Sequence, residues 1–145
     1  MTNMRFLLTV ALLAVIMLLT VACSKAQAKR PALKNTVWVC ERQMFVADVG
    51  TMTETYTLKL LPGKQCILEN KWVTPAHPAT YMLADGTVET IPENSSESSS
   101  VGTWNYRRGK LTVTGEDIPE IVLIYHKDSL VSKEFYGQEA TFVKR

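Results

Sequence analysis

Short runs of alternating apolar and polar residues, separated by turn signals, constrain the fold of this chain most strongly. Between residues 56 and 60, for example, Tyr, Leu and Leu alternate with Thr57 and Lys59. Successive side chains of a β-strand point to opposite faces, so this pattern is typical of a strand with one buried face. No segment after the N-terminal region keeps an apolar stripe of period 3.6 for three turns. The sequence therefore predicts an all-β domain.

The expected strands follow one another along the whole domain. They cover residues 35–40 with a looser continuation to 46, then 52–61, 65–73, 80–84, 87–91, 101–106, 110–114, 120–126, 129–135 and 139–144. Pro62-Gly63 and Asp85-Gly86 are strong turn signals between neighbouring strands. Pro92–Ser100 is rich in serine and has no apolar residue to bury, so we expect it to be mobile and without a strand.

The succession of hairpins predicts the architecture. Sequential hairpins form a meander, and a long meander best avoids exposed edges by closing on itself. Residues 35–145 are numerous enough to bury an independent core. We therefore expect one up-and-down meander β-barrel over residues 35–145, with a two-sheet β-sandwich as the alternative.

The N-terminal segment differs from the rest of the chain. One charge, Arg5, precedes an unbroken apolar run from Phe6 to Ala22, which is typical of a signal peptide. The following Ala22-Cys23-Ser24 resembles the lipobox of bacterial lipoproteins, although Thr20 stands where leucine is preferred. In that family the cysteine thiol is acylated and becomes the first residue after cleavage.

The resemblance to the lipobox sets the expected domain boundaries and location. Residues 1–22 are expected to be a lipoprotein signal peptide and residues 23–34 a tether with lipid on Cys23. Ordinary secretory cleavage and a retained transmembrane helix are the alternatives. The resemblance implies the cell envelope, and Ser24 in place of Asp implies the outer membrane more than the inner membrane.

The charge of the chain limits the kinds of partner that it can bind. The chain has 14 acidic and 16 basic residues, and all except Arg5 follow the apolar run, so the exported part is near neutral. No basic patch interleaved with aromatic residues is present, and nucleic acid is therefore not expected as a partner. The basic run Lys25–Arg30 lies next to the lipidated cysteine, where it could contact anionic head groups. We expect a monomer on the membrane surface.

If Cys23 carries lipid, Cys40 and Cys66 remain as a candidate disulfide pair in an oxidising compartment. Strand alternation turns both thiols inward. However, they lie on the first and third strands of the meander, roughly 9–10 Å apart, whereas a disulfide usually needs Cα atoms within about 6.8 Å. Either the first strand bends across the barrel end, or both thiols are free and buried. His77 and His126 lack metal-site spacing relative to the cysteines, so neither a metal nor a cofactor is expected.

The inner face of the predicted barrel is rich in aromatic residues. The candidates for ligand binding are Trp38, Tyr56, Trp72 and Trp104. A barrel of eight strands can hold one small ligand, or its own side chains can fill it, and we favour filling.

Catalysis is not expected, because no Gly-x-Ser-x-Gly motif is present. The two histidines, and the acidic residues Glu116, Asp117 and Glu120, are interpreted as solvated loop residues. Two functions remain. The first is binding of a small lipophilic ligand or an envelope protein by the barrel. The second is a structural or inhibitory interaction module that uses the loops Thr74–Pro78 and Pro92–Ser100.

Three short motifs carry a resemblance to a known group of domains. Leu33-Lys-Asn-Thr-Val-Trp38 resembles the L-x-G-T-x-W start of lipocalin-like and META-type domains in small bacterial lipoproteins, with Asn35 in place of glycine. Gly102–Tyr106 followed by Leu111–Thr114 resembles the G-T-Y/W-x-Y…L-T-L-T hairpin of the same group, and Phe142–Lys144 is similar to its last strand. The resemblance implies a lipocalin-like barrel without catalytic residues.

Overall fold

The computed structural model describes residues 30–145 of the chain, of which Leu33–Arg145 form one compact unit. The expected signal peptide, the lipidation site Cys23 and most of the expected tether lie outside the described residues. Within residues 30–145, no helix is both long enough and apolar enough to cross a membrane.

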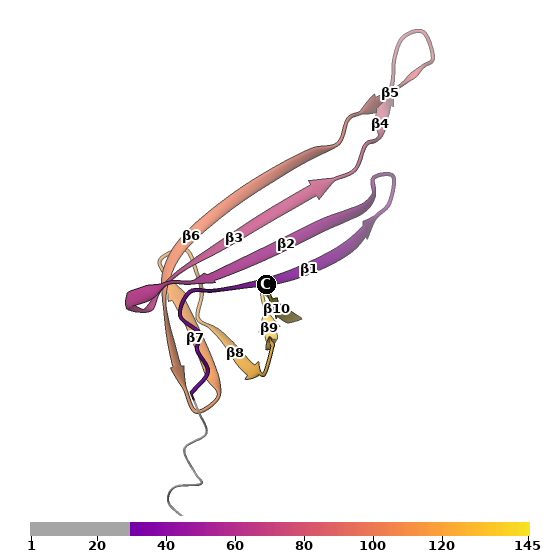
Figure 1. Ribbon diagram of the computed structural model, residues 1–145. Coiled ribbons are helices and arrows are strands. Elements are labelled where there is room, and N and C mark those ends of the chain that lie inside the picture. The colour runs from indigo at the N-terminus through magenta and orange to yellow at the C-terminus, as the bar shows by residue number, and fades with distance from the viewer. Residues whose placement is uncertain (1–29) are drawn as a thin grey trace, which may run out of the picture. The chain divides into compact units, whose positions relative to one another are not determined.

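Strands joined by short turns make up the described unit (Figure 1). They are β1 (Thr36–Val46), β2 (Gly50–Leu60), β3 (Gln65–Thr74), β4 (His77–Met82), β5 (Val88–Ile91), β6 (Asn94–Arg107), β7 (Lys110–Gly115), β8 (Ile121–His126), β9 (Ser129–Phe135) and β10 (Gln138–Lys144), with a short 3-10 turn, η1 (Pro62–Lys64), after β2. Eight of them close into an antiparallel barrel in the order β1-β10-β9-β8-β7-β6-β3-β2. The predicted all-β meander barrel is confirmed, and the sandwich alternative is wrong.

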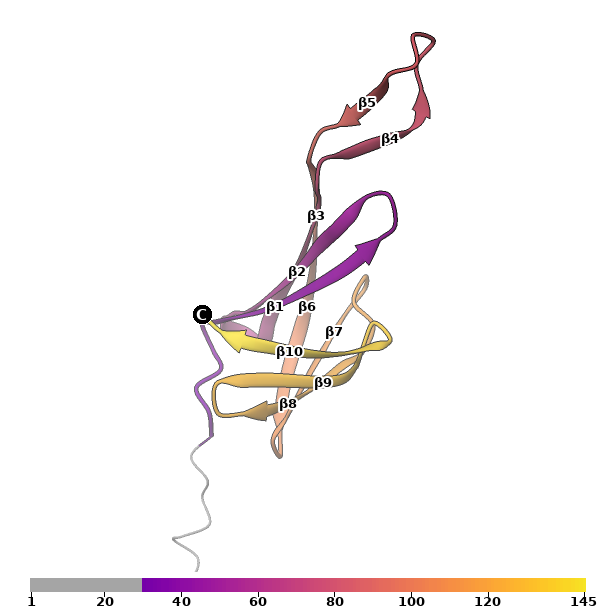
Figure 2. The ribbon, with the colours of Figure 1, turned by 90° about the vertical axis from the view of Figure 1, so that its right-hand side faces the viewer.

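The meander has one interruption, between β3 and β6. These two strands pair with each other, and the chain between them leaves the barrel to form the separate two-stranded sheet β4–β5. Figures 1 and 2 show this excursion extending beyond the ends of β3 and β6. We call residues 75–93 the arm. Its turn is the predicted Asp85-Gly86 signal, where Asp85 Oδ1 accepts a hydrogen bond from the Thr87 amide at 2.9 Å.

The serine-rich segment is a strand, contrary to the sequence-based expectation. β6 begins at Asn94 and pairs with β3 from Thr74↔Asn94 to Leu68↔Ser100. Most of these serine side chains are exposed, so apolar burial does not order them. The backbone of β3 supplies ladder hydrogen bonds that composition does not reveal, and these bonds define the strand.

The barrel interior is filled by its own side chains. The largest fully buried ones are Trp38, Phe135, Phe142, Leu58, Leu60, Leu111, Leu123, Leu130, Val113 and Cys66. The inward direction predicted for Trp38, Tyr56 and Leu123 is confirmed, because each is buried, whereas Trp72 and Trp104 are half-buried. The interior is therefore a packed core.

One end of the barrel, which we call the closed end, is where the chain enters the domain. Leu33 is buried there, and its carbonyl oxygen accepts a hydrogen bond from the Thr36 hydroxyl. Trp38 Nε1 in turn donates to Thr36 Oγ1 at 2.7 Å, and the Trp38 ring meets Tyr125 edge to face at 6.3 Å. The motif Leu33–Trp38 thus links the start of the domain to its core.

The opposite end, which we call the open end, is splayed. β1 pairs with β10 only at Trp38↔Lys144 and Val39↔Val143, whereas β1 and β2 remain paired as far as Val46↔Gly50. The β1–β2 hairpin therefore diverges from β10 (Figure 2). Inward-facing positions beyond Val39 are not covered by a paired neighbour on that side.

Candidate functional site: a pocket at the open end

A pocket of about 340 Å³ lies at the open end, between the β1–β2 hairpin and the β9–β10 turn. Its lining residues come from four strands and one turn: Arg42, Gln43, Met44, Glu54, Tyr56, Trp72, Tyr136 and Gln138. The volume is near the lower limit of the roughly 300–1,000 Å³ of small-molecule sites. The pocket therefore suits a compact ligand.

Strand alternation explains why polar residues reach this pocket. Arg42 continues the inward series of Trp38 and Cys40, past the point where pairing with β10 ends. Glu54 is the cross-strand partner of Arg42 and lies two residues before Tyr56 on the same face of β2. Trp72 on β3 is in turn the partner of Glu54. The pocket is thus an extension of the core face in which charged residues replace aliphatic ones.

Aromatic rings of the core support the pocket residue Tyr56. Phe135 is buried behind the lining and meets Tyr56 and Phe142 edge to face, with ring centroids 4.7 and 5.1 Å apart. Tyr136 stacks on Tyr56, with centroids 5.7 Å apart and an interplanar angle of 15°. Tyr136 and Gly137 have φ of 48° and 79°, the two positive values that are typical of a type I′ hairpin turn.

Arg42 bridges the splayed strands. Its Nη2 donates to the Phe135 carbonyl oxygen at 3.1 Å, and its guanidinium carbon lies 5.0 Å from the Phe135 ring centroid and 5.6 Å from that of Tyr56. Both distances are within the range of cation–π contacts. Its Nε is buried and has no hydrogen-bond partner among residues 30–145. This buried donor of the guanidinium is therefore unsatisfied.

A buried carboxylate faces the same space. Glu54 is only 8% exposed, and its Oε1 accepts a hydrogen bond from Asn70 Nδ2 at 2.9 Å. The ion pairs of the described residues are Lys59–Glu69 and Lys71–Glu97, so Glu54 and Arg42 do not neutralise each other by direct contact. Burial, and then a hydrogen bond with Glu54, raises the pKa of Tyr56. Burial and the charge of Glu54 raise the pKa of Tyr136, so both phenols stay neutral at ordinary pH.

The structure brings together two of the four predicted ligand-binding residues. Tyr56 and Trp72 line the pocket. Trp38 is instead a core residue at the closed end, and Trp104 is half-buried, with its Nε1 donating to the Leu61 carbonyl oxygen at 3.1 Å. Arg42, Glu54 and Tyr136 were not predicted from the sequence. Arg42 and Glu54 could have been found, because each is a charged residue at an inward position of an expected strand.

Cys40 and Cys66 do not form the candidate disulfide, because both thiols are free and buried. Cys40 on β1 is the cross-strand partner of Tyr56 on β2, and Cys66 on β3 is the partner of Leu60 on β2. The two cysteines are therefore offset by four residues, about 13 Å along the strands, in addition to two strand spacings of about 4.8 Å each. The free-thiol alternative holds, since β1 does not bend across the barrel end.

The histidines and the acidic turn residues of the described domain lie apart from the pocket. Within residues 30–145, no group of three or more His, Cys, Asp or Glu side chains is placed to hold a metal ion. His77 Nδ1 lies 2.9 Å from the Pro75 carbonyl oxygen, and His126 is exposed at the end of β8. Glu116, Asp117 and Glu120 are exposed in the β7–β8 connection.

Comparison of the chain with protein-family descriptions and with curated proteins gives no match. Its fold is an eight-stranded antiparallel closed β-barrel with a pocket at one end.

Proposed function

We propose that this chain is a non-enzymatic lipoprotein of the bacterial cell envelope that binds a compact ligand at the open end of its barrel. The apolar run before Cys23 and the lipobox-like Ala22-Cys23-Ser24 support lipid anchoring, in the outer membrane rather than the inner. The closed-end contacts of Leu33, Thr36 and Trp38 support a lipocalin-like or META-type domain, since they give the L-x-x-T-x-W motif a structural role.

The observation that carries the binding proposal is the combination of aromatic walls with a single cationic group. Tyr56, Trp72 and Tyr136 offer ring surfaces, and Arg42 is the one cation among the lining residues. A hydrogen bond from this guanidinium to a charged acceptor would contribute about 1.5–3 kcal/mol. The filled interior argues against a ligand held deep in the barrel. A small aromatic carboxylate therefore suits the site better than a long acyl chain.

The experiment is calorimetric titration of the mature lipoprotein in detergent with 1-naphthoate, with neutral 1-naphthylmethanol and with palmitate. We expect saturable binding of naphthoate and weaker binding of the other two. Arg42→Met should weaken naphthoate binding about tenfold or more, because a hydrogen bond to a charged group contributes about 1.5–3 kcal/mol. Arg107→Met, at the closed end, is the matched control and should bind as the unchanged protein does.

Two results would contradict the binding proposal. One is the lack of saturable naphthoate binding, and the other is equal affinity in the Arg42→Met and Arg107→Met variants. NMR adds a second check, because Trp72 is the one tryptophan in the pocket lining. Its indole signal, assigned by its loss in the Trp72→Phe variant, should shift on naphthoate binding.

Anchoring is tested separately. Cys23→Ser, or treatment with globomycin, should block maturation and leave the precursor at its full mass. Normal processing in either experiment would exclude the lipoprotein and leave the alternatives of a secreted protein or a retained helix.

A role as a structural or inhibitory interaction module is the second candidate function. The arm favours it, because this element lies outside the barrel core and exposes apolar side chains at its tip. Of the two loops expected to act in this way, Thr74–Pro78 leads into the arm, whereas most of Pro92–Ser100 belongs to β6.

A further inference from the structure

Large apolar side chains are exposed along the arm. Tyr81 is 54% exposed, Met82 68% and Leu83 43%, and Val88 on the opposite strand is also exposed. Single exposed apolar residues are normal, but these four belong to one two-stranded element. An isolated two-stranded hairpin is at best marginally stable in water. The arm thus presents apolar surface that its own fold does not cover.

The charge of the arm is of one sign. Asp85, Glu89 and Glu93 lie on it, and Glu97 follows on β6, while the sequence has no Lys or Arg between Trp72 and Tyr106. Hydrogen bonds from the Thr87 hydroxyl and amide lower the pKa of Asp85, so this carboxylate keeps its charge in mild acid. Anionic lipid would be repelled by such a surface, whereas a basic protein surface would be attracted.

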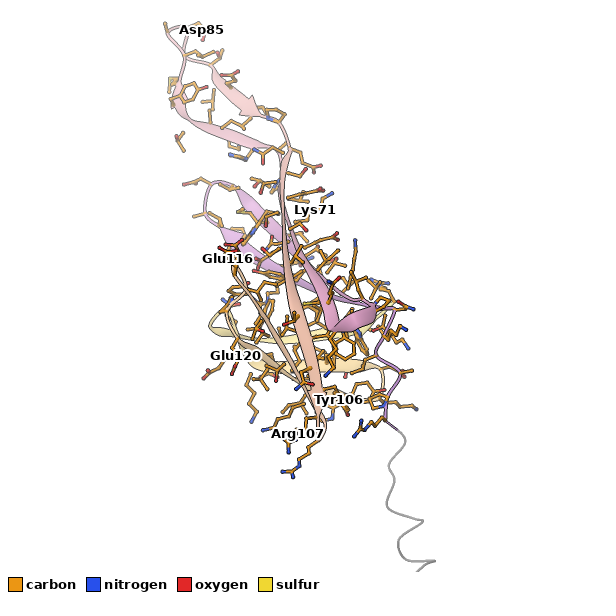
Figure 3. All side chains as sticks on the ribbon, turned by 90° about the vertical axis from the view of Figure 1, so that its left-hand side faces the viewer. Lys71, Asp85, Tyr106, Arg107, Glu116 and Glu120 are labelled. Carbon is orange, nitrogen blue, oxygen red and sulfur yellow. The ribbon has the colours of Figure 1, made fainter. Side chains whose placement is uncertain are left out.

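The opposite end of the domain has the opposite charge. Basic residues gather at the closed end, in the turns and terminal residues there: Lys34, Lys64, Arg107, Arg108, Lys127, Lys144 and Arg145. Figure 3 shows Asp85 at the tip of the arm and Arg107 at the far end of the domain. An anionic membrane would therefore attract the closed end, where the chain enters at Leu33, and not the arm.

Tyr81 and Glu89 together form a recognition point on the arm. The Tyr81 hydroxyl donates to Glu89 Oε2 at 2.7 Å, which fixes a carboxylate beside an aromatic ring. A guanidinium or ammonium group could stack on that ring and pair with the carboxylate in the same pose. Tyrosine is enriched among the residues that dominate binding energy at interfaces.

We propose that the arm is a docking element for a partner protein whose surface combines apolar residues with lysine or arginine. Tyr81 and Glu89, neighbours across β4 and β5, form the centre of the contact on one face of the arm. Met82 is next to Tyr81 and points to the other face, so the partner encloses the arm from both sides. This interaction is independent of the ligand proposed for the open-end pocket.

The experiment is photo-crosslinking in cells that produce the full-length protein, with a photoreactive phenylalanine analogue placed at Met82. The matched control position is Val122, an exposed apolar residue on the barrel wall. We expect one protein adduct from position 82 and none of the same mass from position 122. Glu89→Lys should abolish the adduct, whereas Asp128→Lys, which reverses a charge at the closed end, should leave it unchanged.

Binding is then measured with the purified partner identified from that adduct. Glu89→Lys should weaken the affinity for the partner at least tenfold. Raised salt should weaken the affinity of the unchanged protein. Reversal of the matching basic residue on the partner should restore binding to the Glu89→Lys variant. Equal urea midpoints of the variants would show that the barrel is unaffected. The proposal is wrong if the adducts at position 82 are with lipid or with a second copy of this chain, if they persist in Glu89→Lys, or if none form.

Discussion

Phe135, which is buried against the pocket residues Tyr56 and Tyr136, allows a sharp test of how the open end is held together. The substitution is Phe135→Leu, which retains most of the apolar volume but removes the ring. Phe135 meets Tyr56, Tyr136 and Phe142 edge to face at 4.7, 4.8 and 5.1 Å, and Arg42 lies over its face at 5.0 Å. Removal of the ring therefore removes these aromatic and cation–π contacts at once.

The expected loss of stability follows from these contacts. A swap that nearly conserves volume costs less than about 1.5 kcal/mol in a packed core. Each aromatic pair adds about 0.5–1.5 kcal/mol beyond burial, and the cation–π contact about 0.5–1 kcal/mol. Because contacts that share one ring are not additive, we expect a total of about 2–3 kcal/mol. Tyr136→Leu is the matched control. Residue Tyr136 is 48% exposed, so we expect a loss of less than about 1 kcal/mol.

The assay is urea unfolding followed by tryptophan fluorescence and circular dichroism, with the slope m checked for constancy. A double-mutant cycle of Phe135→Leu with Arg42→Met should give a coupling of about 0.5–1 kcal/mol. The reasoning is refuted if Phe135→Leu costs no more than Tyr136→Leu, or if the cycle gives no coupling.

Four further predictions follow from individual residues. Cys66 should react with a thiol reagent only on unfolding, because it is fully buried and burial raises its pKa, and the mass of the mature protein should not change on reduction. The pKa of Tyr56 is raised in the folded state, so its ionisation should not affect stability below about pH 10, where unfolded tyrosine begins to ionise. Above that pH the free energy of unfolding should fall, and Tyr56→Phe should reduce this fall in urea titrations. Amides of residues 94–101, where β6 pairs only with β3, should exchange hydrogen faster than those of Gly102 and Thr103, where β6 pairs with both β3 and β7; equal protection would contradict the pairing. Gly102→Ala should lower the thermal midpoint, because its Cβ would lie 2.3 Å from the Thr114 carbonyl oxygen; an unchanged midpoint would refute this close approach.

Strand alternation made much of the barrel predictable. The inward direction of Trp38 and Leu58, read from the sequence, agrees with their burial, and the Asp85-Gly86 turn lies where it was expected. The strand at Asn94–Ser100 was not predictable from its own residues. It is defined by the backbone of β3, a partner distant in sequence, and neither composition nor periodicity reports such pairing.

The pocket was predictable only in part. Tyr56 and Trp72 were expected to face inward, but no local signal showed that β10 would separate from β1 after Val39. That divergence turns the inward positions of Arg42 and Glu54 from core sites into pocket walls. Tyr136 lies in a turn, where periodicity carries no information about direction.

The short seam between β1 and β10 has a kinetic consequence. It joins the first and last strands of the domain through the pairs Trp38↔Lys144 and Val39↔Val143. Its closure therefore brings together the parts of the domain that are most distant in sequence, and it forms fewer residue pairs than any other strand pairing of the barrel. The entropy of closing so long a loop is recovered only when the local hairpins are already in place. We expect the seam to form last in folding and to open first in the native state. Because the pocket adjoins this seam, a bulkier ligand could be admitted by its opening while every hairpin of the barrel stays intact.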